Sequence, residues 1–191
     1  MRSAAIAAAT CWLVASPCVS LADRVAGEEK ADLCLSCHGA LAYEGKNYIP
    51  VLDGQPPAYF IAQLTAYKIG KRTDAAMNTN AASLSVVDAQ DLADFFASRK
   101  SGPYPVFDLE RAGSGMKTLS QLPCGSCHGS DHSGNGPVPR LAGQNPRYVA
   151  SELRSMRSGK RSHPASDGGD AMKTLTDDDI NNVAHALASL N

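Results

Sequence analysis

The feature that most constrains this chain is a Cys-x-x-Cys-His sequence that occurs twice, as CLSCH at residues 34–38 and as CGSCH at residues 124–128. The two histidines are 90 positions apart, and other segments recur at nearly the same spacing. The longest matches are IPVLDGQPPAYF at 49–60 with VPRLAGQNPRYV at 138–149, and LSVVDAQDLADFFAS at 84–98 with LTDDDINNVAHALAS at 175–189. This self-similarity indicates two copies of a unit of about 85 residues, in which only loop lengths differ.

Each copy of the motif predicts one covalently bound haem c. Two thiols three positions apart on one helical turn can add to the two vinyl groups of a haem, and the next histidine is then held under the iron. A zinc site would need a second ligand pair nearby at the usual spacing, which the sequence lacks. A redox-active Cys-x-x-Cys would usually lie between a strand and a helix, and no strand is expected here. We expect haem attachment at Cys34, Cys37, Cys124 and Cys127, and iron ligation by His38 and His128.

The N-terminus has the pattern of a cleaved export signal. Arg2 precedes an apolar stretch from Ala4 to Ala15, and Pro17 is followed by small residues at Ser20 and Ala22. We expect cleavage after Ala22 and a periplasmic mature protein. An uncleaved membrane anchor is the alternative, although the apolar run is short for a membrane span.

The mature chain is expected to hold two domains of similar size. Removal of the signal peptide, residues 1–22, leaves the four motif cysteines as the only ones. We place the first domain at 23–100 and the second at 108–191, with the linker SGPYPVF at 101–107. The linker is short and stiff because two prolines and a glycine break helices. Each domain is small for a stable core, so a large apolar prosthetic group would help it to fold.

The apolar periodicity predicts an all-α fold with no strands. Residues 24–37 are expected to form a helix that runs into the first motif, and residues 57–69 a second one that stops at Gly70. The last helix of each half is expected to begin at a capping box, Ser85 with Asp88 and Thr176 with Asp179.

The charge balance and the absence of familiar catalytic patterns narrow the function. Eighteen basic residues face 19 acidic ones, which argues against a nucleic-acid-binding protein. No nucleophile–base pair, acid pair or phosphate loop stands out. The sequence therefore favours electron transfer.

The motifs and the repeat resemble the diheme cytochrome c4 family, whose chains hold two class I-type cytochrome c domains. The resemblance covers nearly all of the mature chain and rests on CLSCHG and CGSCHG, PVLDGQ and PRLAGQ, and GKR at 70–72 and 159–161. It implies a pseudo-symmetric domain pair that carries electrons in the periplasm. It also implies that the carbonyls of Pro50 and Pro139 bond the ligand histidines and orient their rings.

The resemblance further implies that a methionine completes each iron site. Met77 lies in TDAAMNTNAAS, a polar segment expected to be a loop, seven residues before Leu84, and is expected to bind the first iron. A thioether ligand favours ferrous iron and raises the reduction potential.

The second half departs from this pattern. The position equivalent to Met77 is Gly168, and the loop is two residues longer than in the first half. We favour Met172 as the ligand, because the extra length would let it reach the iron. His163 is the alternative, and an open or exchangeable site is the third possibility.

Other polar residues have simpler interpretations. His132 is expected to be exposed in a Gly-rich loop. Arg72 and Arg161, each with the lysine before it, would offset propionate charge or dock a partner, unless they are simply solvated at helix ends, near the C-terminal dipole. Tyr59 and Tyr148 match across the repeat and would pack in the core or bond a propionate.

The leading functional hypothesis is an electron carrier with no catalytic residues of its own. Its expected partners are a quinol-oxidising complex, a terminal oxidase or a periplasmic dehydrogenase, with no nucleic acid and at most a loose association with the membrane. The alternatives are a redox enzyme that uses an open second haem, and a cytochrome subunit of a dehydrogenase.

Overall fold

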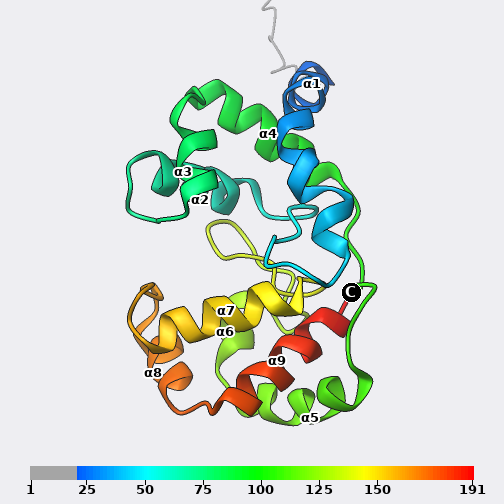
Figure 1. The fold of residues 1–191 in the computed structure, drawn as a ribbon, viewed down its shortest axis with the longest axis vertical. Helices are drawn as coiled ribbons and strands as arrows, with labels where there is room; N and C mark the ends of the chain where they lie inside the picture. The colour runs from blue at the N-terminus through cyan, green and yellow to red at the C-terminus, as the bar shows by residue number, and fades with distance from the viewer. Residues whose placement is uncertain (1–20) are drawn as a thin grey trace, which may run out of the picture.

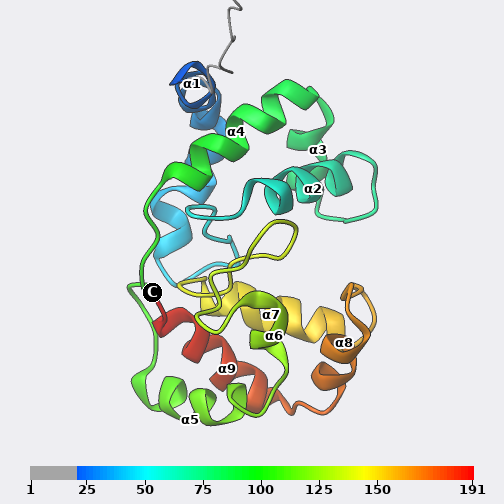
Figure 2. The same cartoon turned by 180° about the vertical axis from the view of Figure 1, so that it is seen from behind.

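The computed structural model describes residues 21–191, with side-chain positions for all of these except 21–24, 166 and 167. The chain forms two helical lobes that lie one above the other along the long axis (Figures 1 and 2). Residues 21–191 contain no strand, only an isolated bridge between Asn135 and Val138, so the all-α prediction is confirmed. The expected signal peptide lies outside the described residues except for Leu21 and Ala22. No helix in the described part is long and apolar enough to cross a membrane.

The first lobe is built from four α-helices and one 3-10 turn. The elements are α1 (Leu21–His38), η1 (Ala40–Tyr43), α2 (Pro57–Lys68), α3 (Ala75–Ala82) and α4 (Val86–Ser98). Helix α1 runs directly into the first motif, as predicted. Helix α4 begins at the predicted capping box, in which the Asp88 backbone N–H donates to Ser85 Oγ and Ser85 N–H donates to Asp88 Oδ2.

The second lobe repeats this order with two differences, since its motif forms a separate helix and the 3-10 turn has no counterpart. The elements are α5 (Leu109–Leu119), α6 (Cys124–His128), α7 (Pro146–Arg157), α8 (Ser166–Lys173) and α9 (Asp177–Ser189). The second motif forms a short helix of its own, because Pro123 and a turn separate it from α5. Helix α9 begins at the second predicted capping box, Thr176 with Asp179.

Each lobe has its own core beneath a pair of crossed helices. Helix α1 packs against α4, and α5 packs against α9. The crossings are close because each has a glycine at the contact. A Cβ atom on Gly27 would lie 2.2 Å from the carbonyl oxygen of Asp91, and one on Gly115 would lie 1.9 Å from that of Asn182. The main buried apolar residues are Phe60, Leu92 and Phe96 in the first lobe and Val149, Ile180 and Leu187 in the second.

The segment between the lobes is anchored to both. Tyr104 is fully buried, and its ring packs in a small cluster with Val51 and Ala188. Its hydroxyl donates to the carbonyl of Ala42 in the first lobe, and its backbone N–H donates to the carbonyl of Ala188 in the second. The junction is therefore a packed element and not a free tether.

Two local expectations from the sequence are wrong. The segment around Met77 is the helix α3 and not a loop, because Asp74 caps its first turn. His132 is buried, with only 9% of its surface exposed. It adopts a positive φ of 58°, and the segment 138–142 folds back so that Leu141 N–H and Ala142 N–H both donate to its carbonyl.

Candidate haem sites

The first motif presents two thiols and one imidazole at the C-terminal end of α1. Cys34 is half-buried and Cys37 is exposed, and neither forms a disulfide. His38 Nδ1 lies 2.9 Å from the carbonyl oxygen of Pro50. A carbonyl only accepts, so Nδ1 carries the proton and donates, which leaves the lone pair on Nε2. This is the bond that the family resemblance implied.

The second motif has the same arrangement. Cys124 is half-buried, Cys127 is exposed, and His128 Nδ1 donates to the carbonyl of Pro139 over 2.9 Å. His128 itself is 8% exposed. The two imidazole rings are thus oriented in the same way, and in each the lone pair of Nε2 can bind a metal ion.

Burial keeps these groups in their neutral forms. It lowers the pKa of His38 and His128 below the ordinary value, against the opposing effect of the proline carbonyls. Burial also raises the pKa of the Cys34 and Cys124 thiols. A neutral imidazole with one free nitrogen is a metal ligand, and paired thiols beside it are the donor set of a c-type haem. The residues present therefore fit haem c.

The distal side of the first lobe is formed by α3. Met77 is its third residue and is half-buried, and its backbone N–H donates to Asp74 Oδ1 over 2.9 Å. The next residue, Asn78, ties α3 to the end of α2, because its Nδ2 donates to the carbonyls of Tyr67 and Arg72. The backbone at Met77 is thus held in place from two sides.

The distal side of the second lobe is formed by α8 and the segment before it. Gly168 is the third residue of α8 and so corresponds to Met77. Met172 is buried, with 9% of its surface exposed, and the His163 ring lies 6.3 Å from the His128 ring between centroids. His163, the alternative ligand from the sequence, therefore lies beside the imidazole of the second motif.

Two glutamines join the lobes by a reciprocal set of hydrogen bonds. The Gln144 side chain accepts from Val51 N–H over 2.7 Å and donates to the Val51 carbonyl over 2.9 Å. The Gln55 side chain accepts from Arg140 N–H over 3.1 Å and donates to the Arg140 carbonyl over 2.9 Å. Sequence reasoning missed this pair, although the matching DGQ and AGQ segments placed both glutamines at equivalent positions.

A second cross-lobe cluster shows that Arg72 and Arg161 are not simply solvated at helix ends. Arg72 donates to the hydroxyl of Tyr148 over 2.8 Å and pairs with Glu152 over 3.2 Å. Arg161 pairs with the same carboxylate and reaches the hydroxyl of Tyr59 over 3.5 Å. Two guanidinium groups therefore share one carboxylate between the lobes.

Two helical lobes, each with a thiol pair and an oriented imidazole, define a two-domain c-type cytochrome. A model of the cytochrome c family matches residues 114–191. The chain is 35% identical over 149 residues to cytochrome c4 of Pseudomonas aeruginosa, covering 74% of each chain. It is 29% identical to the thiosulfate dehydrogenase electron acceptor of Stutzerimonas stutzeri, covering 82% of this chain and 78% of that protein. The crystal structure of reduced cytochrome c4 from Pseudomonas stutzeri superposes with a TM-score of 0.76 and 28% identity, covering 88% of this chain and 98% of that one.

The chain belongs to the diheme cytochrome c4 family. Its cofactors are two covalently bound haem c groups. It transfers electrons between redox protein partners.

Proposed function

We propose that this protein is a periplasmic carrier in which the two lobes form one relay. Residues 23–100 and 108–191 would be the two haem domains, residues 101–107 the linker, and residues 1–22 the cleaved signal. The observation that carries the proposal is the reciprocal Gln55 and Gln144 contact, which holds both motifs in one body. A fixed distance between two redox centres is what transfer between them requires.

The residues that would hold the cofactors follow from the geometry. Cys34 and Cys37 would attach the first haem and Cys124 and Cys127 the second, with His38 and His128 as the first iron ligands. Met77 would complete the first site, where its backbone is already fixed by Asp74. Haem c supplies a one-electron iron couple, and the chain's own contribution is to orient the ligands and shield them from water.

The partners would be a quinol-oxidising complex or a periplasmic dehydrogenase as donor and a terminal oxidase as acceptor. The test is stopped-flow reduction of the purified holoprotein by such a complex, followed by its oxidation by a terminal oxidase. Transfer faster than the turnover of the donor supports the carrier; failure of every donor to reduce either haem would contradict it.

A second candidate is a dedicated electron acceptor for a dehydrogenase that oxidises sulfur anions. The observation that favours it is the 29% identity to the thiosulfate dehydrogenase electron acceptor. Reduction by thiosulfate only when the cognate dehydrogenase is present would support this role. Reduction by thiosulfate alone would instead indicate that the second haem is itself catalytic.

A further inference from the structure

We infer that His163 is the sixth ligand of the second haem iron, so that this haem is held by two histidines and the first by His38 and Met77. The inference concerns the distal side of the second lobe, where the sequence alone favoured Met172. It rests on the haem in that lobe and not on any particular partner.

The two distal helices correspond residue for residue. Helices α3 and α8 have eight residues each, and in both lobes two residues separate the helix from the N-cap of the closing helix. The corner after each helix is held in the same way, since Lys68 Nζ donates to the carbonyl of Leu84 and Arg157 donates to that of Leu175. Met77 therefore corresponds to Gly168, and Ala81 to Met172.

The extra length of the second loop lies before α8 and not beside Met172. Two residues separate Arg72 from α3, whereas four, residues 162–165, separate Arg161 from α8. The added segment contains His163. The extra loop length that was expected to let Met172 reach the iron is thus at the N-terminal end of α8, whereas Met172 is near its C-terminal end.

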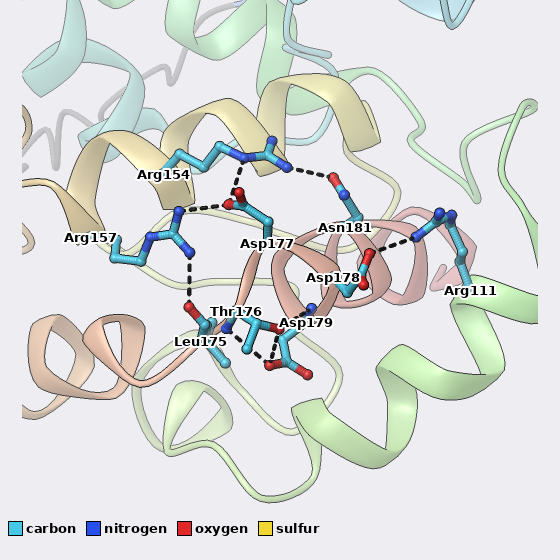
Figure 3. Close-up of polar contacts among 9 residues, drawn as sticks. All are labelled: Arg111, Arg154, Arg157, Leu175, Thr176, Asp177, Asp178, Asp179 and Asn181. Atoms are coloured by element: carbon cyan, nitrogen blue, oxygen red, sulfur yellow. Dashed lines mark hydrogen bonds and ion pairs between the residues drawn. The ribbon is translucent and has the colours of Figure 1, made fainter.

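Met172 has a different place in the fold. It lies at the position of Ala81, and both side chains are buried, with 9% and 1% of their surfaces exposed. Its carbonyl accepts from Leu175 N–H over 3.2 Å. Figure 3 shows the bond from Arg157 to the carbonyl of Leu175 that holds the following corner. Met172 therefore occupies a core position where the first lobe has only a methyl group.

The His163 ring takes the space that a side chain at position 168 would need. A Cβ atom on Gly168 would lie 2.5 Å from Cε1, 2.7 Å from Nδ1 and 3.3 Å from Nε2 of His163. No methionine could stand there while the ring stays. A methionine at position 168 and the His163 ring in its present place therefore exclude each other.

The separation of the His163 and His128 rings fits a shared metal ion. An imidazole nitrogen binds a transition metal at about 2 Å, so two rings on opposite sides of one ion have centroids roughly 6 Å apart. The observed separation is 6.3 Å, with the rings tilted by 47°. The observed centroid separation is therefore close to the one that ligation of a single iron by both rings would give.

The Nδ1 atom of His163 contacts the backbone of Ala165. Nδ1 lies 3.0 Å from the carbonyl of Ala165, the shorter of its two contacts, the other being to Ala165 N–H at 3.3 Å. With the proton on Nδ1, the lone pair is on Nε2, as in His128. Metal-binding histidines commonly donate their second N–H to a backbone carbonyl in this way.

The ligand difference would set a direction for electrons, a consequence that also rests on the proposed carrier function. Thioether ligation raises the potential of a haem relative to ligation by two histidines. The second lobe would then have the lower potential and the first lobe the higher. A donor would reduce the haem of the second lobe, and the haem of the first lobe would pass the electron to an acceptor.

Spectroscopy of the holoprotein tests the ligand assignment. We would record the thioether-to-iron charge-transfer band of the ferric protein by near-infrared magnetic circular dichroism, and carbon monoxide binding by the ferrous protein. The variants are His163→Ala, Met172→Ala as matched control, and Met77→Ala to identify the thioether signal. Potentiometry would give one potential for each haem.

The expected wild-type result is a thioether signal from one haem only, which Met77→Ala abolishes. His163→Ala should make the second haem high-spin and able to bind carbon monoxide, and added imidazole should restore the low-spin state. Met172→Ala should leave both spectra unchanged. Thioether signals from both wild-type haems, or a high-spin second haem in Met172→Ala, would overturn the assignment. The wild-type spectrum decides even where a variant does not fold, and a failure of the carrier function would appear only in assays with partners.

Discussion

Gln55 and Gln144 are related by the internal pseudo-two-fold symmetry, and each bonds both backbone groups of one residue in the opposite lobe. Both side chains are buried, at 6% and 5% exposure. Backbone groups that would otherwise be unsatisfied on one lobe are thus completed by the other. The interface is specified by matched polar geometry as well as by apolar contact.

Removal of the Gln144 amide is expected to weaken the interface. In Gln144→Ala, Val51 N–H and carbonyl lose their partners in a buried place, at about 1–3 kcal/mol for each unsatisfied group. We expect the free energy of unfolding to fall by at least about 2 kcal/mol. Urea unfolding of the holoprotein measures this.

The matched control is Gln90→Ala, because Gln90 is exposed on α4 and bonds only to Asp94. Its effect should stay within about 0.5 kcal/mol. Equal losses in the two variants would show that the reciprocal bonds contribute nothing specific.

The helix crossings predict a strong effect of a single methyl group. In Gly115→Ala the new Cβ would meet the Asn182 carbonyl at 1.9 Å, so α5 and α9 must separate. Overpacking of this kind costs about 1–3 kcal/mol, and backbone contact places this site at the upper end. Gly27→Ala should behave alike at the crossing of α1 and α4.

Gly113→Ala on the same helix is the control for Gly115→Ala. Nothing lies within 4 Å of its added Cβ, so only helix propensity changes. It should stabilise the protein by about 0.5–1 kcal/mol. The melting temperature, measured by circular dichroism, should therefore fall in Gly115→Ala and rise in Gly113→Ala. A change in the same direction in both variants would contradict the close-contact argument.

Local and repeated features of this protein were predictable from its sequence. The capping boxes at Ser85 and Thr176 depend on two residues three positions apart, so they can be read directly. The His38 to Pro50 bond could be expected because the family resemblance implied it. The attachment motifs are equally local, since one helical turn contains all their chemistry.

What the sequence did not reveal depends on contacts between distant segments. Arg72 follows the end of a helix, where basic residues are usually solvated, yet its partners Tyr148 and Glu152 lie in the other lobe. His132 is buried because segment 138–142 folds over it, which no local pattern announces. The His163 ring lies where a side chain at position 168 would be, which is possible because that residue is Gly168. The sequence showed that a methionine is missing there, but it did not show which side chain occupies the space.

The cluster of Arg72, Arg161 and Glu152 between the lobes predicts that removal of its negative charge destabilises the protein. Glu152→Gln keeps the size of the side chain but leaves Arg72 and Arg161 without their shared counter-charge, at 13% and 21% side-chain exposure. Removal of one partner of a partly buried pair costs more than the pair contributes, and we expect a loss of about 1–3 kcal/mol in urea unfolding.

The control for Glu152→Gln is Asp170→Asn, which breaks an exposed pair with Lys173 at 71% and 67% exposure. Exposed pairs contribute little, so the change should be close to zero. Added salt should narrow the difference between the variants only slightly, because the interior pair is poorly screened. A large salt effect on Glu152→Gln would mean that the cluster is open to solvent.

The start of α9 predicts part of the acid sensitivity of the second lobe (Figure 3). Hydrogen bonds from Arg157 and then Arg154 hold the pKa of Asp177 below its ordinary value. The folded state therefore binds this proton less readily than the unfolded state. Its contribution to stability is present above the ordinary carboxyl pKa, about 4, and is lost as the pH falls toward the lower pKa of the folded state.

Asp177→Asn should accordingly lower the melting temperature at neutral pH and flatten its decline between about pH 5 and about pH 2, so that the two curves converge in acid. Asp178→Asn is the control, because Asp178 is 88% exposed and lies 4.0 Å from Arg111. Its curve should run parallel to that of the wild type. Since Arg157 also holds the Leu175 carbonyl, the same protonation loosens the corner that positions α8. The environment of the second haem should therefore change before that of the first as the pH is lowered, and simultaneous changes in the two spectra would contradict this link.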